Sequence, residues 1–274
     1  MIQNLEDQSP LDPEHMLKWY VECGVDECIS DNTTNWFEEQ DKTSLKQIVT
    51  PNQPTAQKRQ AVPTLASNKD IIIGAEKVAA ACTNLEELNQ AILSFEGCSL
   101  KNTASNTVFS DGNRSSQIMV IGEAPGDLED KIGKPFISED EGLLLDKMFA
   151  AIDLSREKDF YITNVIPWRP PGNRKPTDSE CAMCLPFLKR HIELFNPKLI
   201  ITIGGVSASY LLNEKAGITK LRGSWKEYEV NDQSNKIPLM PLLHPAYLIK
   251  HPHYKKQTWH DLLNIKERLA SIIL

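Results

Sequence analysis

Four polar segments follow the predicted strands of this chain, and each carries side chains that could bind a polar ligand or act on it. They are residues 122–130, 163–174, the pair Gly204 and Gly205, and residues 244–249. Loops that follow parallel strands gather on one rim of the sheet. Carboxylates, an amide and an imidazole would meet there, and these groups serve acid–base and electrostatic catalysis. The alternatives are ordinary turns, a solvated acidic turn at 127–130 and a structural histidine at His244.

The elements that would position these segments alternate along the chain. Apolar runs predict strands at 118–121, 160–162, 199–203, 225–230 and 237–242. Helical periodicity predicts helices at 142–152, 178–195, 206–212 and 255–272. An earlier helix is expected to begin at an N-cap, Thr83, with its apolar positions at Leu85, Leu88, Ile92 and Phe95. Strands that alternate with helices indicate an α/β fold with a parallel sheet covered on both faces.

The net charge of −7 is unevenly distributed over the 274 residues. Residues 1–150 hold 12 Lys and Arg against 25 Asp and Glu, a net −13, whereas residues 151–274 hold 18 against 12, a net +6. The whole-chain charge argues against nucleic acid as a partner. Its distribution permits such a partner, because the basic half carries three of the four polar segments in full.

The N-terminal part differs from the rest. Residues 11–24 predict a short amphipathic helix, and the polar, proline-containing stretch 30–70 predicts a flexible linker. We therefore expect an acidic, partly disordered arm over 1–70 and a globular domain over 71–274. No run approaches the roughly 18 apolar residues of a membrane helix, and no secretory signal is evident. Six sparse cysteines fit a reducing, cytoplasmic location.

In order and spacing, the motifs of residues 96–274 resemble the type-4 uracil-DNA glycosylases. The resemblance rests on Gly122–Gly126 with Glu129-Asp130, Gly133-Lys134-Pro135-Phe136, Thr163-Asn164 with 169–174, Leu221-Arg222-Gly223 and His244-Pro245-Ala246. It implies a three-layer α/β/α sandwich with a mainly parallel central sheet. It also implies hydrolysis of the N-glycosidic bond of a flipped-out deoxyuridine in DNA, which releases uracil and leaves an abasic site.

The resemblance assigns roles to residues of the pocket. Asn164 would read the Watson–Crick edge of uracil, Phe136 would stack on the base, and His244 would donate to O2 as negative charge develops. The backbone around Gly122 would line the pocket, because small residues let the main chain approach a ligand closely. Glu129 with Asn173 would orient the attacking water, and Glu123 would shape the pocket and contact the base.

The same resemblance predicts the DNA contacts. Tyr247, Leu248 and Ile249 follow His244 in the segment that the family uses as an apolar wedge, with ordinary core packing as the alternative for each. Phosphate contacts are expected from basic residues nearby, namely Arg169, Arg174, Lys175, Lys250, His251, His253, Lys255 and Lys256.

The chain departs from the family at its iron–sulfur ligands. Type-4 enzymes hold a [4Fe–4S] cluster on four cysteines, of which only Cys98 and Cys184 match here, while Phe95 and Trp168 stand at the other two positions. Two thiolates do not complete the usual ligand set. Cys82 or Cys181 could substitute, although neither has the family's spacing. We therefore expect no cluster and no other metal.

Three functions stay open from the sequence. The first is uracil removal in base excision repair. The second is a glycosylase with broader specificity for deaminated bases, and the third is a non-catalytic or polymerase-associated DNA-binding protein on the same fold. The partner expected in each case is DNA, single- or double-stranded, bound by a monomer. The acidic arm could recruit a protein partner.

Overall fold

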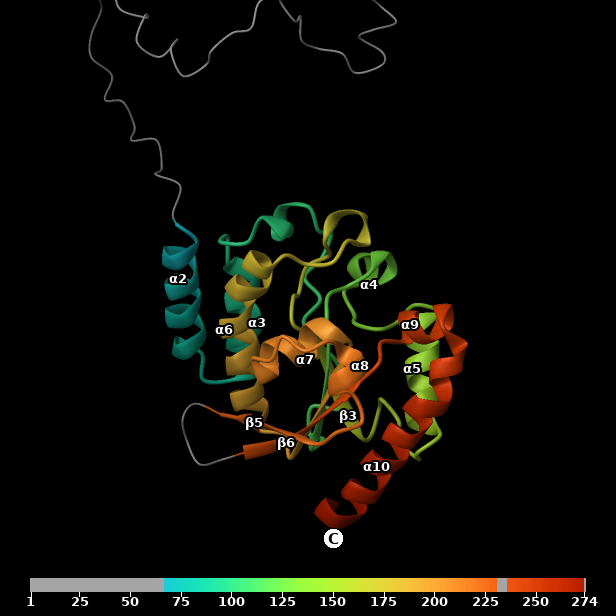
Figure 1. Ribbon diagram of the computed structural model, residues 1–274. Coiled ribbons are helices and arrows are strands. Elements are labelled where there is room, and N and C mark those ends of the chain that lie inside the picture. Colours follow the sequence, from blue (N-terminus) through green and yellow to red (C-terminus); the bar gives the residue numbers. More distant parts are fainter. Residues whose placement is uncertain (1–66, 231–235, 274) are drawn as a thin grey trace, which may run out of the picture. The chain divides into compact units, whose positions relative to one another are not determined.

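The computed structural model describes residues 67–230 and 236–273, with side chains up to residue 270. Within these ranges helices flank a central sheet on both faces, so the three-layer α/β/α prediction is confirmed (Figure 1). The predicted helix at 11–24 and nearly all of the linker at 30–70 lie outside the described residues. In the part of the chain that is described, no helix is both long and apolar enough to cross a membrane.

Six strands of the described chain form one sheet, in the order β1-β3-β2-β4-β6-β5. The inner four run parallel, and the edge strands β1 and β5 pair antiparallel with β3 and β6. Their bounds are β1 Asp111–Gly112, β2 Ile118–Gly122, β3 Phe160–Asn164, β4 Leu199–Ile203, β5 Lys226–Glu229 and β6 Lys236–Leu242. All four parallel strands therefore end at one edge, where the polar segments begin.

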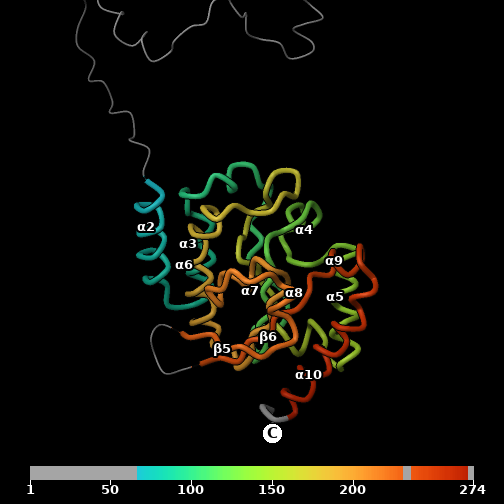
Figure 2. The backbone as a smooth tube through the Cα atoms, viewed as in Figure 1, coloured from blue at the N-terminus to red at the C-terminus, as the bar shows by residue number. Residues whose placement is uncertain are grey.

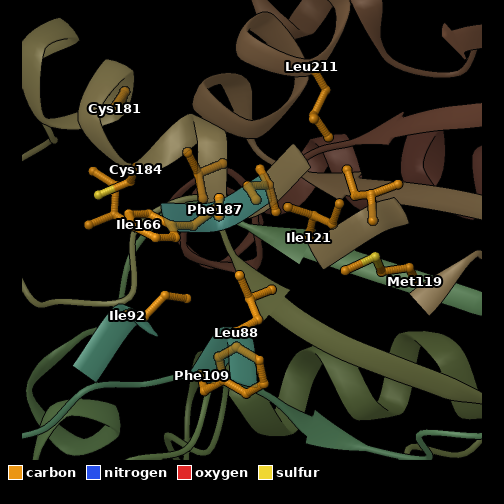
Figure 3. Packing of buried hydrophobic residues seen from close by; sticks show 14 of the residues in the cluster. Leu88, Ile92, Phe109, Met119, Ile121, Ile166, Cys181, Cys184, Phe187 and Leu211 are labelled. Atoms are coloured by element: carbon orange, nitrogen blue, oxygen red, sulfur yellow. The ribbon is translucent and has the colours of Figure 1, made fainter. Parts of the chain in front are cut away.

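The inner strands send alternate residues into two separate apolar clusters, because successive side chains of a strand point to opposite faces. On β2, Met119 and Ile121 enter one cluster, whereas Ile118 and Val120 enter the other. The first cluster gathers Leu88, Phe187 and Leu211 from the covering helices (Figure 3). Burial on both faces explains why these strands are continuous apolar runs.

Helices α2 (Asn68–Ala81), α3 (Leu85–Ser94), α6 (Asp178–Phe195) and α7 (Gly205–Leu212) contribute to the first cluster. Helix α2 was not predicted, and the linker prediction was wrong for its last residues. The Ser67 side chain accepts from the Asp70 amide in a capping box, which starts that helix. The N-cap of α3 is Asn84 and not Thr83, because Asn84 Oδ1 accepts from the Glu87 amide at 2.8 Å.

Helices α5 (Glu141–Ala150), α9 (Pro245–Lys250) and α10 (Lys255–Ile273) contribute to the second cluster and lie together on the other side of the sheet (Figure 2). The acidic segment after β2 is a helix, α4 (Asp127–Ile132), instead of a solvated turn, and the short α8 (Ile218–Leu221) precedes β5. The remaining short 3-10 turns are η2 (Ser99–Asn102), η3 (Pro171–Asn173) and η4 (Pro252–Tyr254).

Candidate active site

A pocket of about 550 Å³ opens at the carboxyl edge of the four parallel strands. All four polar segments contribute to its wall, so the tertiary structure brings together the rim that the sequence predicted. Its polar lining is Glu123, Glu129, Glu141, Asn164, Asn173, Arg174, Lys175, His244, Tyr247 and Lys250, and Phe136 supplies an aromatic wall.

Asn164 is a buried amide with an unused acceptor. It ends β3, is 6% exposed, and its Oδ1 has no hydrogen-bond partner among the described residues. Leaving a buried acceptor unpaired costs about 1–3 kcal/mol. Because Asn164 also lines the pocket, a bound ligand with an N–H group could satisfy this oxygen.

Gly122 is the residue that lets Asn164 and Phe136 approach each other. It ends β2 directly opposite Asn164 in the parallel register. A Cβ at this position would collide with both Asn164 Oδ1 and the Phe136 ring. The glycine is therefore required by the close approach of an amide and an aromatic ring, which are suited to recognise the edge and the face of one base.

Phe136 holds a backbone conformation that side chains rarely adopt, with φ at 51°. Arg156 compensates for it: its guanidinium donates to the Phe136 carbonyl at 2.7 Å and to the Pro135 carbonyl at 2.8 Å. Asp146 accepts from the same guanidinium at 2.9 Å. This clamp fixes the ring against the pocket. Nothing in the sequence marked Arg156, because its partners are backbone atoms of a loop 20 residues away.

His244 has a defined tautomer when its ring is neutral. Its Nδ1 accepts from the Ala246 amide at 3.2 Å, so the ring proton lies on Nε2. The ring packs beside Phe136, with centroids 5.6 Å apart, and is half-buried in the pocket wall. An Nε2–H donor next to the aromatic wall can stabilise negative charge on a bound base.

Two carboxylates of the pocket differ in their partners. Glu123 Oε1 accepts from the Val206 amide at 3.0 Å and packs against Gly204, so it joins the loop after β2 to the one after β4. Glu129 is 7% exposed, and its Oε1 accepts from the Ser138 amide at 3.2 Å. Glu123 is therefore suited to shape the pocket, whereas Glu129 presents a buried carboxylate that can accept from water.

Asn173 lies at the mouth of the pocket and is held by Arg169. Arg169 Nε donates to Asn173 Oδ1 at 2.7 Å, and its Nη1 donates to Asp127 Oδ1 at 2.7 Å. The hydrogen bond from Lys131 is the largest of the interactions that lower the pKa of Asp127. This bond orients the Asn173 amide, whose NH₂ group is left to donate to a ligand or a water molecule. An amide can hold a water molecule in this way, but it is not a base and does not take the water's proton.

The predicted phosphate contacts have different surroundings. Arg169 is engaged as described, and Arg174 forms a two-pronged ion pair with Glu180, which lowers the pKa of Glu180 to about 2. Lys175 and Lys250 are exposed and form no ion pair with another residue of the described ranges. The two lysines are thus available to phosphates, while the two arginines brace the loop.

The three residues predicted as a wedge separate in the structure. Ile249 is 44% exposed, and Tyr247 lines the pocket. Leu248 is 1% exposed and belongs to the second apolar cluster. Its assignment to the wedge is wrong, because the helical turn of α9 points neighbouring side chains in different directions.

The four positions of the family's cluster ligands form what we call the cysteine region, made of Phe95, Cys98, Trp168 and Cys184. The Phe95 ring meets Phe187 edge-on at 4.9 Å, and Trp168 is 1% exposed, with its Nε1 donating to Thr107 Oγ1 at 3.0 Å. Two large aromatic side chains are thus packed into the first apolar cluster at two of the ligand positions.

The two cysteines at the remaining positions, Cys98 and Cys184, are free thiols that share a hydrogen bond. A hydrogen bond from Cys184 lowers the pKa of Cys98, and the same bond together with burial raises the pKa of Cys184 well above its ordinary value. Burial raises the pKa of Cys181 to about 11. Within the described residues no three His, Cys, Asp or Glu side chains form a metal-binding group. Cys23 and Cys28 lie outside those residues. The described residues at the four ligand positions supply two thiols and two aromatic rings, which do not fit a four-thiolate cluster.

Fold and pocket together define an α/β protein with a polar pocket and an aromatic wall at the carboxyl edge of its sheet. Comparison with known proteins shows the family to which it belongs. The model of the uracil DNA glycosylase superfamily matches residues 109–263. The chain is also similar to three proteins named type-4 uracil-DNA glycosylase. That of Saccharolobus solfataricus is 40% identical over 69% of this chain and 88% of its own length.

The other two give the same result. The protein of Sulfurisphaera tokodaii is 35% identical over 67% of this chain and 84% of its own length, and that of Archaeoglobus fulgidus is 36% identical over 67% and 92%. The chain therefore belongs to the uracil-DNA glycosylase superfamily, as the motifs predicted.

Proposed function

We propose that this protein is a uracil-DNA glycosylase that hydrolyses the bond between uracil and deoxyribose in DNA. The observation that carries the proposal is the unpaired acceptor of Asn164, buried beside an aromatic ring in a pocket large enough for a base. Uracil presents N3–H to such an acceptor and O4 to the amide NH₂ group. Cytosine has the opposite polarity at both atoms, so its binding would leave buried groups unpaired.

The neighbouring residues supply the bond cleavage. As the bond to the sugar lengthens, the base leaves as an anion, and the Nε2–H of His244 donates to O2 where that charge develops. The Glu129 carboxylate stabilises the cationic sugar and accepts the proton of the attacking water, which the Asn173 amide holds. Oxygen from water then bonds to the sugar carbon, and the released uracil takes up a proton.

We further propose that this chemistry needs no iron–sulfur cluster, since none of the residues above depends on one. DNA is the proposed partner. A monomeric state, a protein partner of the acidic arm, the domain boundary near residue 70 and a cytoplasmic location stay predictions.

The proposal is tested by incubating the full chain with oligonucleotides that carry uracil, hypoxanthine, thymine or no lesion, in single and double strands. Uracil release, seen as alkali-labile cleavage, is expected only from the uracil substrates. Cleavage at hypoxanthine would support the broader glycosylase instead. DNA binding without any cleavage would support the non-catalytic alternative.

Two variants locate the chemistry. Asn164→Ala and His244→Ala should each slow uracil release by roughly 100-fold or more, because each removes an interaction with the departing base. Both should retain binding to uracil-free DNA, since neither residue is proposed to contact the phosphates. Unchanged rates in either variant would refute its role.

A further inference from the structure

Beside the pocket lies a cluster of four aromatic and imidazole rings, which we call the ring patch. Tyr247 packs against His251 with centroids 4.5 Å apart and against Tyr254 at 5.2 Å, and His253 packs against Tyr254 at 4.3 Å. The rings come from α9, the turn after it and the first residues before α10. Tyr254 takes no part in the proposed bond cleavage, and the sequence predicts only phosphate contacts for His251 and His253.

The ring patch is open to solvent and continuous with the pocket. His251 and His253 are exposed, and the two tyrosines are half-buried. Tyr247 lines the pocket, so the patch begins where a flipped base would enter. A hydrogen bond with Tyr254 raises the pKa of Tyr247, which keeps that phenol neutral. The patch therefore presents ring faces to solvent at the pocket mouth.

Basic residues flank the ring patch on the same short stretch of chain. Lys250, Lys255 and Lys256 are exposed, and none forms an ion pair with any residue whose position is described. Lysines are sufficient to neutralise phosphates, so a role in phosphate binding does not account for the rings. Ring faces beside lysines are the combination that binds unpaired strands, because each base can stack while its phosphate meets a cation.

We propose that the ring patch is a stacking platform for unpaired bases next to the uracil, and that it makes single-stranded DNA the preferred substrate. The proposal rests on the proposed glycosylase function for the uracil itself. In duplex DNA the neighbouring bases are stacked on one another, so their faces cannot reach the patch. In a single strand they are free to stack on the rings while their phosphates meet the lysines.

The test measures binding of the full chain to uracil-free oligonucleotides by fluorescence anisotropy, so it does not depend on catalysis. Three ligands of equal length are compared: an intact single strand, a single strand with consecutive abasic positions, and a duplex. The wild type should bind the intact strand about tenfold or more tightly than the abasic strand, because stacking on aromatic side chains is strong and tolerant of sequence.

The double variant His253→Ala/Tyr254→Leu should weaken binding to the intact strand by a similar factor and leave binding to the abasic strand unchanged. Lys255→Gln is the control for charge, and it should weaken both single strands equally. Equal binding of intact and abasic strands by the wild type would overturn the platform, as would a double variant that still discriminates between them.

A second measurement distinguishes failure of the stacking platform from failure of the proposed glycosylase function. The double variant should keep the wild-type kcat for uracil release from single strands and raise KM about tenfold. If the wild type releases no uracil at all but binds intact strands selectively, the proposed function fails and the platform stands. If uracil is released but intact strands bind no more tightly than abasic strands, the stacking platform is refuted and the glycosylase function stands.

Discussion

The pocket and the cysteine region are built from the same sheet and helices, yet they differ in whether their side chains find partners within the protein. The pocket keeps a buried acceptor without a partner, a phenylalanine at positive φ and three carboxylates. In the cysteine region, apolar packing is complete: the Trp168 N–H has a partner, and Phe95 meets Phe187. Unpaired or strained groups are expected at a binding site, where a ligand supplies the missing interactions. A region without such groups is expected to serve the packing of the core.

The largest effect should come from the glycine beneath the pocket. Gly122→Ala should lower uracil release by about 100-fold or more, because the added methyl group displaces both Asn164 and Phe136. Gly74→Ala on α2 is the matched control, since its Cβ meets nothing within 4 Å. That control should keep full activity. Equal rates for both variants would show that the close approach at Gly122 is unimportant.

A smaller effect is expected from loosening the clamp on the aromatic wall. Arg156→Met should reduce kcat/KM about tenfold. Without the guanidinium, the backbone at Phe136 can leave its positive φ and the ring shifts. A 1 Å misplacement lowers a rate by roughly 100-fold, and we expect a smaller shift here. The matched control is Arg190→Met on the other face of the sheet, where the guanidinium also donates to a backbone carbonyl, that of Cys82. Steady-state rates and thermal unfolding of both variants separate loss of positioning from loss of stability.

On the face of the sheet that holds the cysteine region, a buried histidine should make the stability of the protein depend on pH. Burial lowers the pKa of His191 to about 3, and its Nε2 pairs with the Tyr161 hydroxyl at 2.9 Å. The unfolded chain binds a proton near pH 6.5 and the folded chain does not, so the stability from this group is complete above pH 6.5. It is lost as pH falls from 6.5 toward 3.

Chemical denaturation between pH 7 and 5 measures this loss. Wild type and Tyr161→Phe should both lose stability over that range, by an amount on the order of 1–2 kcal/mol. The double variant Tyr161→Phe/His191→Phe should show a flatter profile. A wild type whose free energy of unfolding does not change from pH 7 to 5 would contradict the burial of a neutral His191.

The smallest effect on catalysis is expected in the cysteine region itself. Cys98→Ala and Cys184→Ala should each leave uracil release within about twofold of wild type, because neither side chain lines the pocket. Purified wild-type protein should be colourless. A brown protein with stoichiometric iron and sulfide, lost in either variant, would overturn the prediction that this chain needs no cluster.

Most of the sheet and of the pocket could be predicted from local pattern. Strands β2 and β4 and the helix α6 agree with their predicted ranges to within a residue, because continuous apolar runs and a capping box are local signals. Helix α2 and the short α9 escaped prediction. In α2, the polar and apolar residues do not alternate with a clear helical period. Helix α9 begins at a His-Pro pair, which is equally typical of a turn.

The sequence by itself determined which residues could meet: Gly122, Asn164 and His244 lie at or just after strand ends, and parallel strands end at one edge. Phe136 lies between α4 and α5, and only the family motif predicted its place in the pocket. Only the tertiary structure decided what each of them does there. It left Asn164 Oδ1 unpaired, engaged Asn173 Oδ1 with Arg169 and buried Leu248. Hydrogen-bond partners and exposure depend on residues distant in the chain, and no local spacing encodes them.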